Sequence, residues 1–256
     1  MRKLLRSQDI LLLGLAGGLD LFEEINDPLS LVSKSYENMY GWVPKKYKRH
    51  NFSHLVWRNI KTGFIEKVEK NGEIYIRLTS QGSQKIIREF PLLSLQKKKW
   101  DKKWRFAIFD IQEVNKNVRD QLRKKLKELG FGMLQKSVFI SPHDVLKDLL
   151  EFIENLSLDE SVYAFEASAL AVGDLKELAN KAWKLDSLND RYNHIVDKIK
   201  EIKNSHLTTN SDRVNSLKKT LKSEYLGVIL QDPFLPEELL PLDWLGEKAK
   251  NLIKAL

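Results

Sequence analysis

The stretch from Lys97 to Pro142 restricts the possible folds of this chain most strongly, because its apolar residues change period twice. Residues Trp104–Ile111 are rich in aromatic and branched side chains, as is typical of a β-strand. Asn117–Leu129 repeats its apolar residues with helical spacing, and Gly130 then favours a helix end. Leu134–Ser141 predicts a second strand. The stretch is therefore predicted to form one strand–helix–strand unit.

The residues that follow extend this unit. Val145–Leu156 predicts a second helix, and Ser161–Ala167 predicts a further strand. The order β-α-β, α-β is most of a ferredoxin-like βαββαβ sandwich. Its fourth strand is either Ala169–Val172 or lies elsewhere.

The N-terminal part predicts a series of helices. Ser7–Ile25 is apolar on nearly all sides and is expected at the centre of a small core. Leu29–Tyr40 predicts a second helix. A third helix begins near Asn51 or Ser53, either of which can cap it, and runs through Lys61.

A β-hairpin is predicted directly after these helices. Phe64–Val68 forms its first strand, Asn71-Gly72 its tight turn and Glu73–Leu78 its second strand. A closing helix follows from Thr79 or Ser80 to Phe90. Three helices, a hairpin and a closing helix are the order of a winged helix-turn-helix, whose third helix reads DNA.

The chain between Pro44 and Gly63 carries six basic residues and no acid. In the third helix, Val56 and Ile60 are expected to face the core, which leaves other side chains on that helix to face outward. A solvated basic surface is the alternative interpretation. The predicted DNA-binding residues are Lys45, Lys46, Lys48, Arg49, His54, Trp57, Arg58, Lys61 and Lys70.

The last third of the chain is helical in pattern. Asp174–Asn204, Ser211–Leu230 and Gly246–Leu256 carry helical apolar spacing. The predicted fold class is α+β, with a winged-helix domain at 1–92, a ferredoxin-like domain that pairs subunits at 93–173 and a helical domain at 174–256.

Composition limits the function further. The net charge of +8 and the pI of about 9.3 favour an anionic partner, here double-stranded DNA. The absence of cysteine excludes disulfides, thiolate zinc sites and a cysteine nucleophile. The apolar run near residue 10 is too short for a membrane span, and Asp20 and Glu23 favour a buried helix over a signal peptide. A cytoplasmic protein that associates with the nucleoid is expected.

Asp110 ends the first central strand and offers an alternative function. A carboxylate there could bind Mg²⁺ for a nuclease, but one chain supplies only Asp110 with Glu113 nearby, so a symmetric dimer would have to join two copies. The simpler interpretation is that Asp110 pairs with Arg119 or Arg123. No cofactor and no catalytic residue are expected on that interpretation, and the protein is then not an enzyme.

A stripe of basic residues on the predicted central helix is a second candidate site. It could bind a small acidic effector, such as a phosphate-bearing metabolite, or it could simply face water. The stripe consists of Lys116, Arg119, Arg123 and Lys127.

Three ordered motifs resemble the PaaX-like transcription regulators, the repressors of phenylacetic acid degradation. The first is WRFAIFDIQE…RDQLRKKLKELGFGMLQKSVFISP, the second AWKLDSLNDRY at 182–192 and the third LQDPFLPEELLPLDWLG at 230–246. Gln112 departs from the family pattern, which usually has proline there. The N-terminal part carries no sharp motif of the family.

The resemblance implies a sequence-specific repressor that docks on its operator as a homodimer and is released by a metabolite. For the best-known members this metabolite is an aryl-coenzyme A thioester, so an acyl-CoA effector is possible for this chain, although no motif assigns one. The central domain of the family is also similar in fold to small CRISPR-associated ferredoxin-like endonucleases. In those enzymes an Asp matching Asp110 binds metal across a dimer.

Overall fold

The computed structural model describes residues 6–16, 24–25, 27–40, 43, 49–90, 92–95, 98–158, 160–168, 173–204 and 212–256. The chain forms two compact units. Unit 1 combines residues 1–89, 188–231 and 245–256, and unit 2 combines residues 90–187 and 232–244. Each unit thus combines separate parts of the chain. The three predicted domains, 1–92, 93–173 and 174–256, are each one continuous stretch, and this division stays a prediction.

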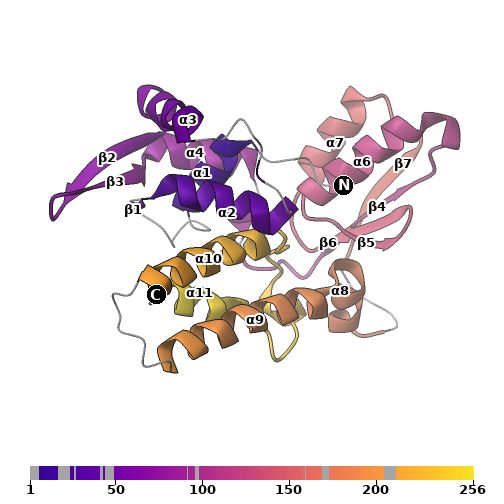
Figure 1. The fold of residues 1–256 in the computed structure, drawn as a ribbon. Coiled ribbons are helices and arrows are strands. Elements are labelled where there is room, and N and C mark those ends of the chain that lie inside the picture. The colour runs from indigo at the N-terminus through magenta and orange to yellow at the C-terminus, as the bar shows by residue number, and fades with distance from the viewer. Residues whose placement is uncertain are drawn as a thin grey trace. The chain divides into compact units, whose positions relative to one another are not determined.

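Unit 1 contains the N-terminal helices, a small sheet and most of the C-terminal helices (Figure 1). Its elements are α1 (Ser7–Ala16), β1 (Glu24–Ile25), α2 (Pro28–Tyr40), α3 (Arg49–Lys61), β2 (Ile65–Lys70), β3 (Glu73–Leu78), α4 (Ser80–Glu89), α9 (Leu185–Asn204) from Leu188 onward, α10 (Asp212–Ile229) and α11 (Gly246–Lys254).

The small sheet has the order β1-β3-β2 and is antiparallel throughout. Asn71 and Gly72 both have positive φ, 52° and 78°, as a two-residue hairpin turn requires, so this prediction is confirmed. Glu24 pairs with Arg77 and Ile25 with Ile76. The predicted helix through Ile25 is therefore wrong at its end, where the chain is extended; residues 17–23 lie outside the described part.

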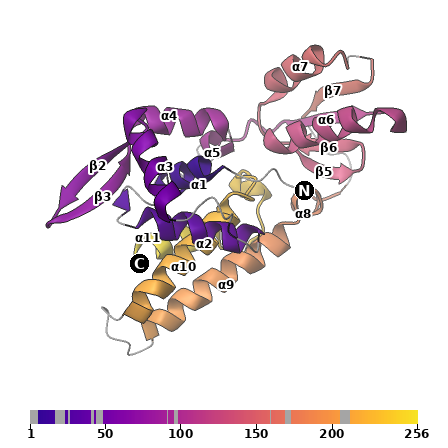
Figure 2. The ribbon, with the colours of Figure 1, turned by 45° about the horizontal axis from the view of Figure 1, so that its top comes forward.

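The core of unit 1 is built around α1 and α2. Ile10 and Leu12 of α1 are fully buried, as the all-round apolar pattern predicts. A Cβ on Gly14 would stand 2.2 Å from Leu31, so glycine is what lets α1 approach α2. On its other side α2 packs along α10 (Figures 1 and 2), where the hydroxyls of Ser35 and Ser223 lie 3.2 Å apart and are fully buried.

Unit 2 contains a four-stranded antiparallel sheet with the order β5-β6-β4-β7. Its elements are α5 (Leu92–Leu95), β4 (Trp104–Phe109), η3 (Glu113–Asn115), α6 (Lys116–Glu128), β5 (Gly132–Gln135), β6 (Val138–Ser141), α7 (Leu146–Asn155), β7 (Val162–Ala167), α8 (Leu175–Trp183) and η4 (Glu237–Leu239).

The chain order in this sheet is β-α-β-β-α-β, the ferredoxin-like order. The prediction of one strand at Leu134–Ser141 is wrong. That stretch contains the end of β5, which begins at Gly132, and the whole of β6, so the fourth strand of the sheet is found here. The two strands form the hairpin β5–β6, folded back at Lys136-Ser137. The alternative position Ala169–Val172 lies outside the described residues.

Both faces of the unit 2 sheet carry cores. On one face Ala107 and Phe109 of β4 pack with Leu122 of α6 and Leu149 of α7. On the other face Trp104 and Ile140 pack with buried residues of α8 and of the segment 235–239.

The predicted helix Asp174–Asn204 is two helices, α8 and α9. Lys184 adopts a left-handed conformation with φ of 56° and ends α8. None of the helices in the described ranges is long and apolar enough to cross a membrane.

Candidate nucleic-acid interface

Helix α3 carries the candidate interface because one of its faces is anchored in unit 1 and the other is exposed. Phe52, Leu55 and Asn59 are buried at helical spacing. Val56 and Ile60, predicted to face the core, are only half-buried, so that prediction is wrong about which face is inside. The helix also begins at Arg49, before either predicted cap.

Asn59 is a buried polar anchor of α3. Its amide nitrogen donates to the carbonyl of Leu55 at 2.8 Å, and its amide oxygen accepts from Nε2 of Gln8 in α1 at 2.7 Å. Because both ends of the amide are satisfied, burial is tolerated and the rotation of α3 against α1 is fixed. Helix α3 ends at Lys61, as predicted, and Gly63, with φ of 74°, follows its end.

The exposed face of α3 presents the four outward side chains that the sequence predicts. His54, Arg58 and Lys61 are exposed, and Trp57 is 58% exposed. The Lys61 ammonium lies 5.1 Å from the centre of the Trp57 ring, a cation–π distance. One helix face thus combines two cations, an imidazole and an indole, while its contact with DNA stays a prediction.

None of the other predicted DNA-binding residues is described on the exposed face of α3. Lys45, Lys46 and Lys48 lie outside the described residues, and of Arg49 only the helical backbone is described. Lys70 is exposed at the tip of the β2–β3 hairpin.

The hairpin itself is balanced in charge rather than basic. Its cations Lys67 and Lys70 are accompanied by Arg77, and Glu66, Glu69 and Glu73 oppose them. Arg77 is already paired with Glu66 at 2.7 Å. The hairpin therefore carries no net charge, whereas the exposed face of α3 carries the cations Arg58 and Lys61 and no acidic side chain.

Asp110 lies directly after β4 and is exposed. Its backbone N–H donates to the carbonyl of Ser161 at 3.0 Å. Among the described residues its carboxylate has no ion pair, so the predicted partnership with Arg119 or Arg123 is not found. No group of three or more metal-ligating side chains occurs in the described ranges. Magnesium binding at Asp110, within one chain or across a dimer, stays a prediction.

The basic stripe of α6 is partly used within unit 2. Arg123 donates to the carbonyl of Lys136 at 2.9 Å, pairs with Asp120 at 3.7 Å and lies 5.8 Å from the Phe109 ring. It therefore holds the β5–β6 turn. Lys116 and Lys127 are exposed and Arg119 is half-buried, and their role as an effector site stays a prediction.

Sequence reasoning did not single out Arg105, the largest fully buried side chain of the described residues. Its guanidinium bonds both carboxylate oxygens of Asp101, the carboxylate of Glu166 at 3.1 Å and the carbonyl of Pro142 at 3.1 Å. The hydrogen bonds from Arg105 hold the pKa of Asp101 below its ordinary value of 3.8. The Lys103 ammonium, 2.9 Å from Glu166, lowers the pKa of that carboxyl. The Trp-Arg pair of the first motif was the available signal.

Two models of protein families match parts of the chain. Residues 97–179 match the family model "PaaX protein central Cas2-like domain", and residues 183–256 match the "PaaX-like protein C-terminal domain". The transcriptional repressor PaaX of Escherichia coli K12 is 28% identical over 184 residues, which cover 69% of this chain and 56% of the relative.

A solved structure of an uncharacterized protein from Mycobacterium tuberculosis shares the fold. It superposes with a TM-score of 0.54 at 17% identity, covering 97% of this chain and 93% of the other. The two family models together span more than half of the chain, in the order that the three motifs predict. The chain therefore belongs to the PaaX-like family of regulators.

Proposed function

We propose that the chain is a sequence-specific DNA-binding repressor of transcription that reads its operator with α3. The element order α1-β1-α2-α3-β2-β3 of unit 1 supports a winged helix-turn-helix in which α3 enters the major groove. The observation that carries the proposal is the exposed face of α3 with Arg58, Lys61, His54 and Trp57. The related repressor from Escherichia coli adds support at the level of the family.

The side chains take different parts in this proposal. Arg58 and Lys61, with His54 and Trp57, read base edges, because Arg and Lys donate to guanine in the major groove. The other predicted cations contact phosphates and carry no sequence information. They are Lys45, Lys46, Lys48 and Arg49 before or at the start of α3, and Lys70 in the hairpin.

Replacing Arg58 with alanine is expected to weaken binding to the preferred duplex by about 1–3 kcal/mol and to relax base preference. Lys46→Ala should instead weaken all duplexes about alike and reduce the slope of log affinity against log salt by about one. Fluorescence anisotropy with a duplex from the upstream region of the gene, and with a shuffled duplex, measures both effects at several salt concentrations.

Lys254→Ala is the matched control, since Lys254 is exposed on α11 and the variant removes one charge without altering α3. Its affinity should stay close to that of the wild type. The proposal fails if the wild type binds the upstream duplex no more tightly than the shuffled one, or if Arg58→Ala leaves the difference between them intact.

The proposal includes a homodimer formed through the sheet of unit 2. Strand β7 is an edge strand, and it exposes Tyr163 and Phe165, 65% and 44% exposed, beside β4. The Phe165 ring stacks on Phe106 with 5.2 Å between centroids. Among the described strands, only β4 pairs with β7, and exposed aromatic side chains at such a sheet edge are typical of protein–protein contacts.

Phe165→Asp is expected to convert the dimer to a monomer at micromolar concentration, because it would bury a charge in an apolar contact. Light scattering after size-exclusion chromatography measures the mass. Leu242→Asp is the control, since Leu242 is 97% exposed and lies outside the sheet. A Phe165→Asp protein with the mass of the wild-type dimer, or a wild type that is monomeric throughout, would contradict the proposal.

A further inference from the structure

Helices α6 and α7 of unit 2 carry opposite charge. α6 contains six cations and two acids, whereas α7 contains three acids and one cation. Leu122 of α6 and Leu149 of α7 pack in one core on the same face of the sheet (Figure 1). The Lys125 ammonium of α6 lies 5.6 Å from the centre of the Phe152 ring of α7, so the helices lie side by side. The exposed side of these two helices is called the helix layer below.

Lys116 and Lys127 stand near the two ends of α6 in the helix layer. They are roughly three helical turns apart, so both project from the same side of the helix. Both are exposed, and the structure gives neither ammonium a hydrogen bond or ion pair to a described residue. The two acids of α6, Asp120 and Glu128, pair with other cations of the same helix, each at 3.7 Å. The two lysine charges are therefore available to another molecule.

The acids of α7 are likewise unpaired. Asp148, Glu151 and Glu154 are exposed, and none of their carboxylates has a hydrogen bond or ion pair to a described residue. Leu150, one helical turn before Glu154, is 47% exposed. The helix layer thus places unpaired cations next to unpaired carboxylates that they do not neutralise within the chain.

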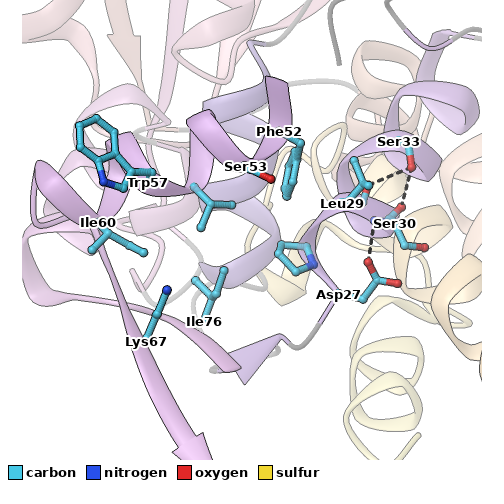
Figure 3. A pocket seen from close by; sticks show the side chains of 12 residues that line it. Asp27, Leu29, Ser30, Ser33, Phe52, Ser53, Trp57, Ile60, Lys67 and Ile76 are labelled. Carbon is cyan, nitrogen blue, oxygen red and sulfur yellow. Dashed lines mark hydrogen bonds between the residues drawn. The ribbon is translucent and has the colours of Figure 1, made fainter. Parts of the chain in front are cut away.

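Several other acids of the protein find their partners within the chain. In unit 1 the Asp27 carboxylate, which lines a hollow beside α3 (Figure 3), accepts from the backbone N–H of Ser30 at 3.1 Å and pairs with Lys219 at 2.8 Å. In unit 2 Glu166 pairs with Lys103 at 2.9 Å. Compared with these groups, the two adjacent rows of opposite charge in the helix layer indicate a partner outside the chain.

The order of the charges determines which partner fits. A nucleic-acid backbone that approached Lys116 and Lys127 would also approach Glu151 and Glu154, and its phosphates would be repelled by these carboxylates. The partner must therefore present both signs side by side, in the reverse order. A second copy of the helix layer meets this condition. A twofold axis in the contact plane, running between the two helices and parallel to them, places α6 of each copy on α7 of the other.

We propose that the helix layer of unit 2 binds the helix layer of a second copy of this chain, with α6 of each copy facing α7 of the other. The contact is isologous, so each pairing of α6 cations with α7 carboxylates occurs twice. The aliphatic stems of the opposing lysines cover Leu150. The contact is separate from the dimer proposed above, because Phe165 stacks on Phe106, which packs on the other face of the sheet.

The contact is expected to be weak in free solution, because each exposed ion pair contributes little and salt screens it. We expect a dissociation constant of roughly 100 μM at low salt, which leaves the mass at micromolar concentration unchanged. Two copies bound to one DNA molecule have a local concentration of about millimolar, where the same contact favours joint occupancy of neighbouring sites. This consequence for DNA rests on the proposed function, whereas the contact itself does not.

Charge reversal tests the pairing. One variant combines Lys116→Glu with Lys127→Glu, and the other combines Glu151→Lys with Glu154→Lys; all four side chains are exposed. Each variant alone should associate at least tenfold more weakly than the unmodified chain, because like charges then face each other. An equal mixture of the two should regain the affinity of the unmodified chain, since each reversed helix meets the reversed helix of the other variant.

Sedimentation velocity of the full chain measures association at about 200 μM protein in about 50 mM and about 500 mM salt. All chains carry Phe165→Asp, so that the sheet contact does not add to the mass. The matched control combines Lys181→Glu with Lys248→Glu, which reverses two exposed cations on α8 and α11 and changes the net charge as the α6 variant does. It should associate like the unmodified chain and should gain nothing when mixed with the α7 variant.

The salt dependence needs no reversed variant, and circular dichroism verifies that each variant is folded. Association of the unmodified chain should be at least tenfold weaker at the higher salt concentration. An unmodified chain that stays monomeric at low salt, association that salt does not change, or a mixture no tighter than its components would overturn the proposal. If Phe165→Asp does not fold, the same comparisons are made with Phe165 in place, where the contact doubles the mass of the species present at micromolar concentration.

Failure of the helix layer and failure of the proposed function are distinguishable. Specific binding to the upstream duplex without association through the helix layer would refute the contact and leave the proposed function standing. Salt-sensitive association restored by mixing, without specific DNA binding, would leave the contact standing and refute the proposed function.

Discussion

Arg105→Ala is expected to lower the free energy of unfolding by about 2–4 kcal/mol at pH 7, somewhat less than the roughly 3–5 kcal/mol for removing one partner of a fully buried ion pair. The variant deletes a guanidinium that is 2% exposed and leaves Asp101, Glu166 and the carbonyl of Pro142 without their shared donor. Both carboxylates keep some access to water, so the loss stays below that of a fully enclosed pair. Urea unfolding followed by circular dichroism measures the change.

The same cluster predicts a dependence on pH. The hydrogen bond from Arg105 holds the pKa of Asp101 below its ordinary value of 3.8. The pKa of Glu166 lies below its ordinary value of 4.5, and the hydrogen bond from Lys103 is the largest cause. A lowered pKa contributes stability that is present above the ordinary value and is lost as pH falls through the folded value. The wild type should therefore lose stability below about pH 4, and Arg105→Ala should lose less over the same range.

Lys103→Ala is the matched control, because Lys103 also pairs with Glu166 but lies at the surface. Its unfolding at pH 7 should stay close to that of the wild type, as is usual for exposed pairs. If Arg105→Ala also unfolds like the wild type at pH 7, the buried guanidinium does not stabilise unit 2.

Ser223→Phe is expected to destabilise unit 1 by about 3 kcal/mol, because Ser35 and Ser223 are fully buried where α2 packs along α10. A phenyl ring cannot fit at this contact without separating the two helices. On the proposed function the affinity for DNA should fall as well, although Ser223 is far in sequence from α3. Thermal unfolding by circular dichroism and anisotropy on the upstream duplex give the two measurements.

Ser216→Phe places the same ring at an exposed position of α10. It leaves the backbone carbonyl that accepts from Lys34 in place and should change the melting temperature little. If Ser223→Phe has the same melting temperature as the wild type, the contact between α2 and α10 does not stabilise unit 1. If it is destabilised but binds DNA normally when folded, the contact serves stability alone.

Local signals made parts of the fold predictable. Asn71-Gly72 was sufficient for the hairpin turn, because few other residues tolerate two positive φ angles in succession. The outward positions of Arg58 and Lys61 followed from helical spacing. Val56 and Ile60 were misplaced because the buried face of α3 includes Asn59, a polar residue that the spacing of apolar residues does not mark. Its burial depends on Gln8, a partner that the local pattern does not reveal.

The spacing of residues along the sequence did not predict contacts between distant segments. The division of Leu134–Ser141 into two strands depends on which strands lie beside β6, and the partners of Arg105 include Glu166 on another strand. Likewise, no local feature indicates that α10 covers α2. The exposed face of α3 was predictable, since its side chains lie on one helix.

The interleaving of the two units has a consequence for synthesis of the protein on the ribosome. The N-terminal part of unit 1 ends at Glu89, but its partner helix α10 is complete only at Ile229, roughly 140 residues later. At roughly 5–20 residues per second, the buried face of α2 stays without its final cover for roughly 7–30 s. During that interval the part of α2 that α10 later covers is open to water, and transiently exposed surface of this kind makes incomplete chains prone to aggregate. The N-terminal part of unit 1 is thus translated first but completed late.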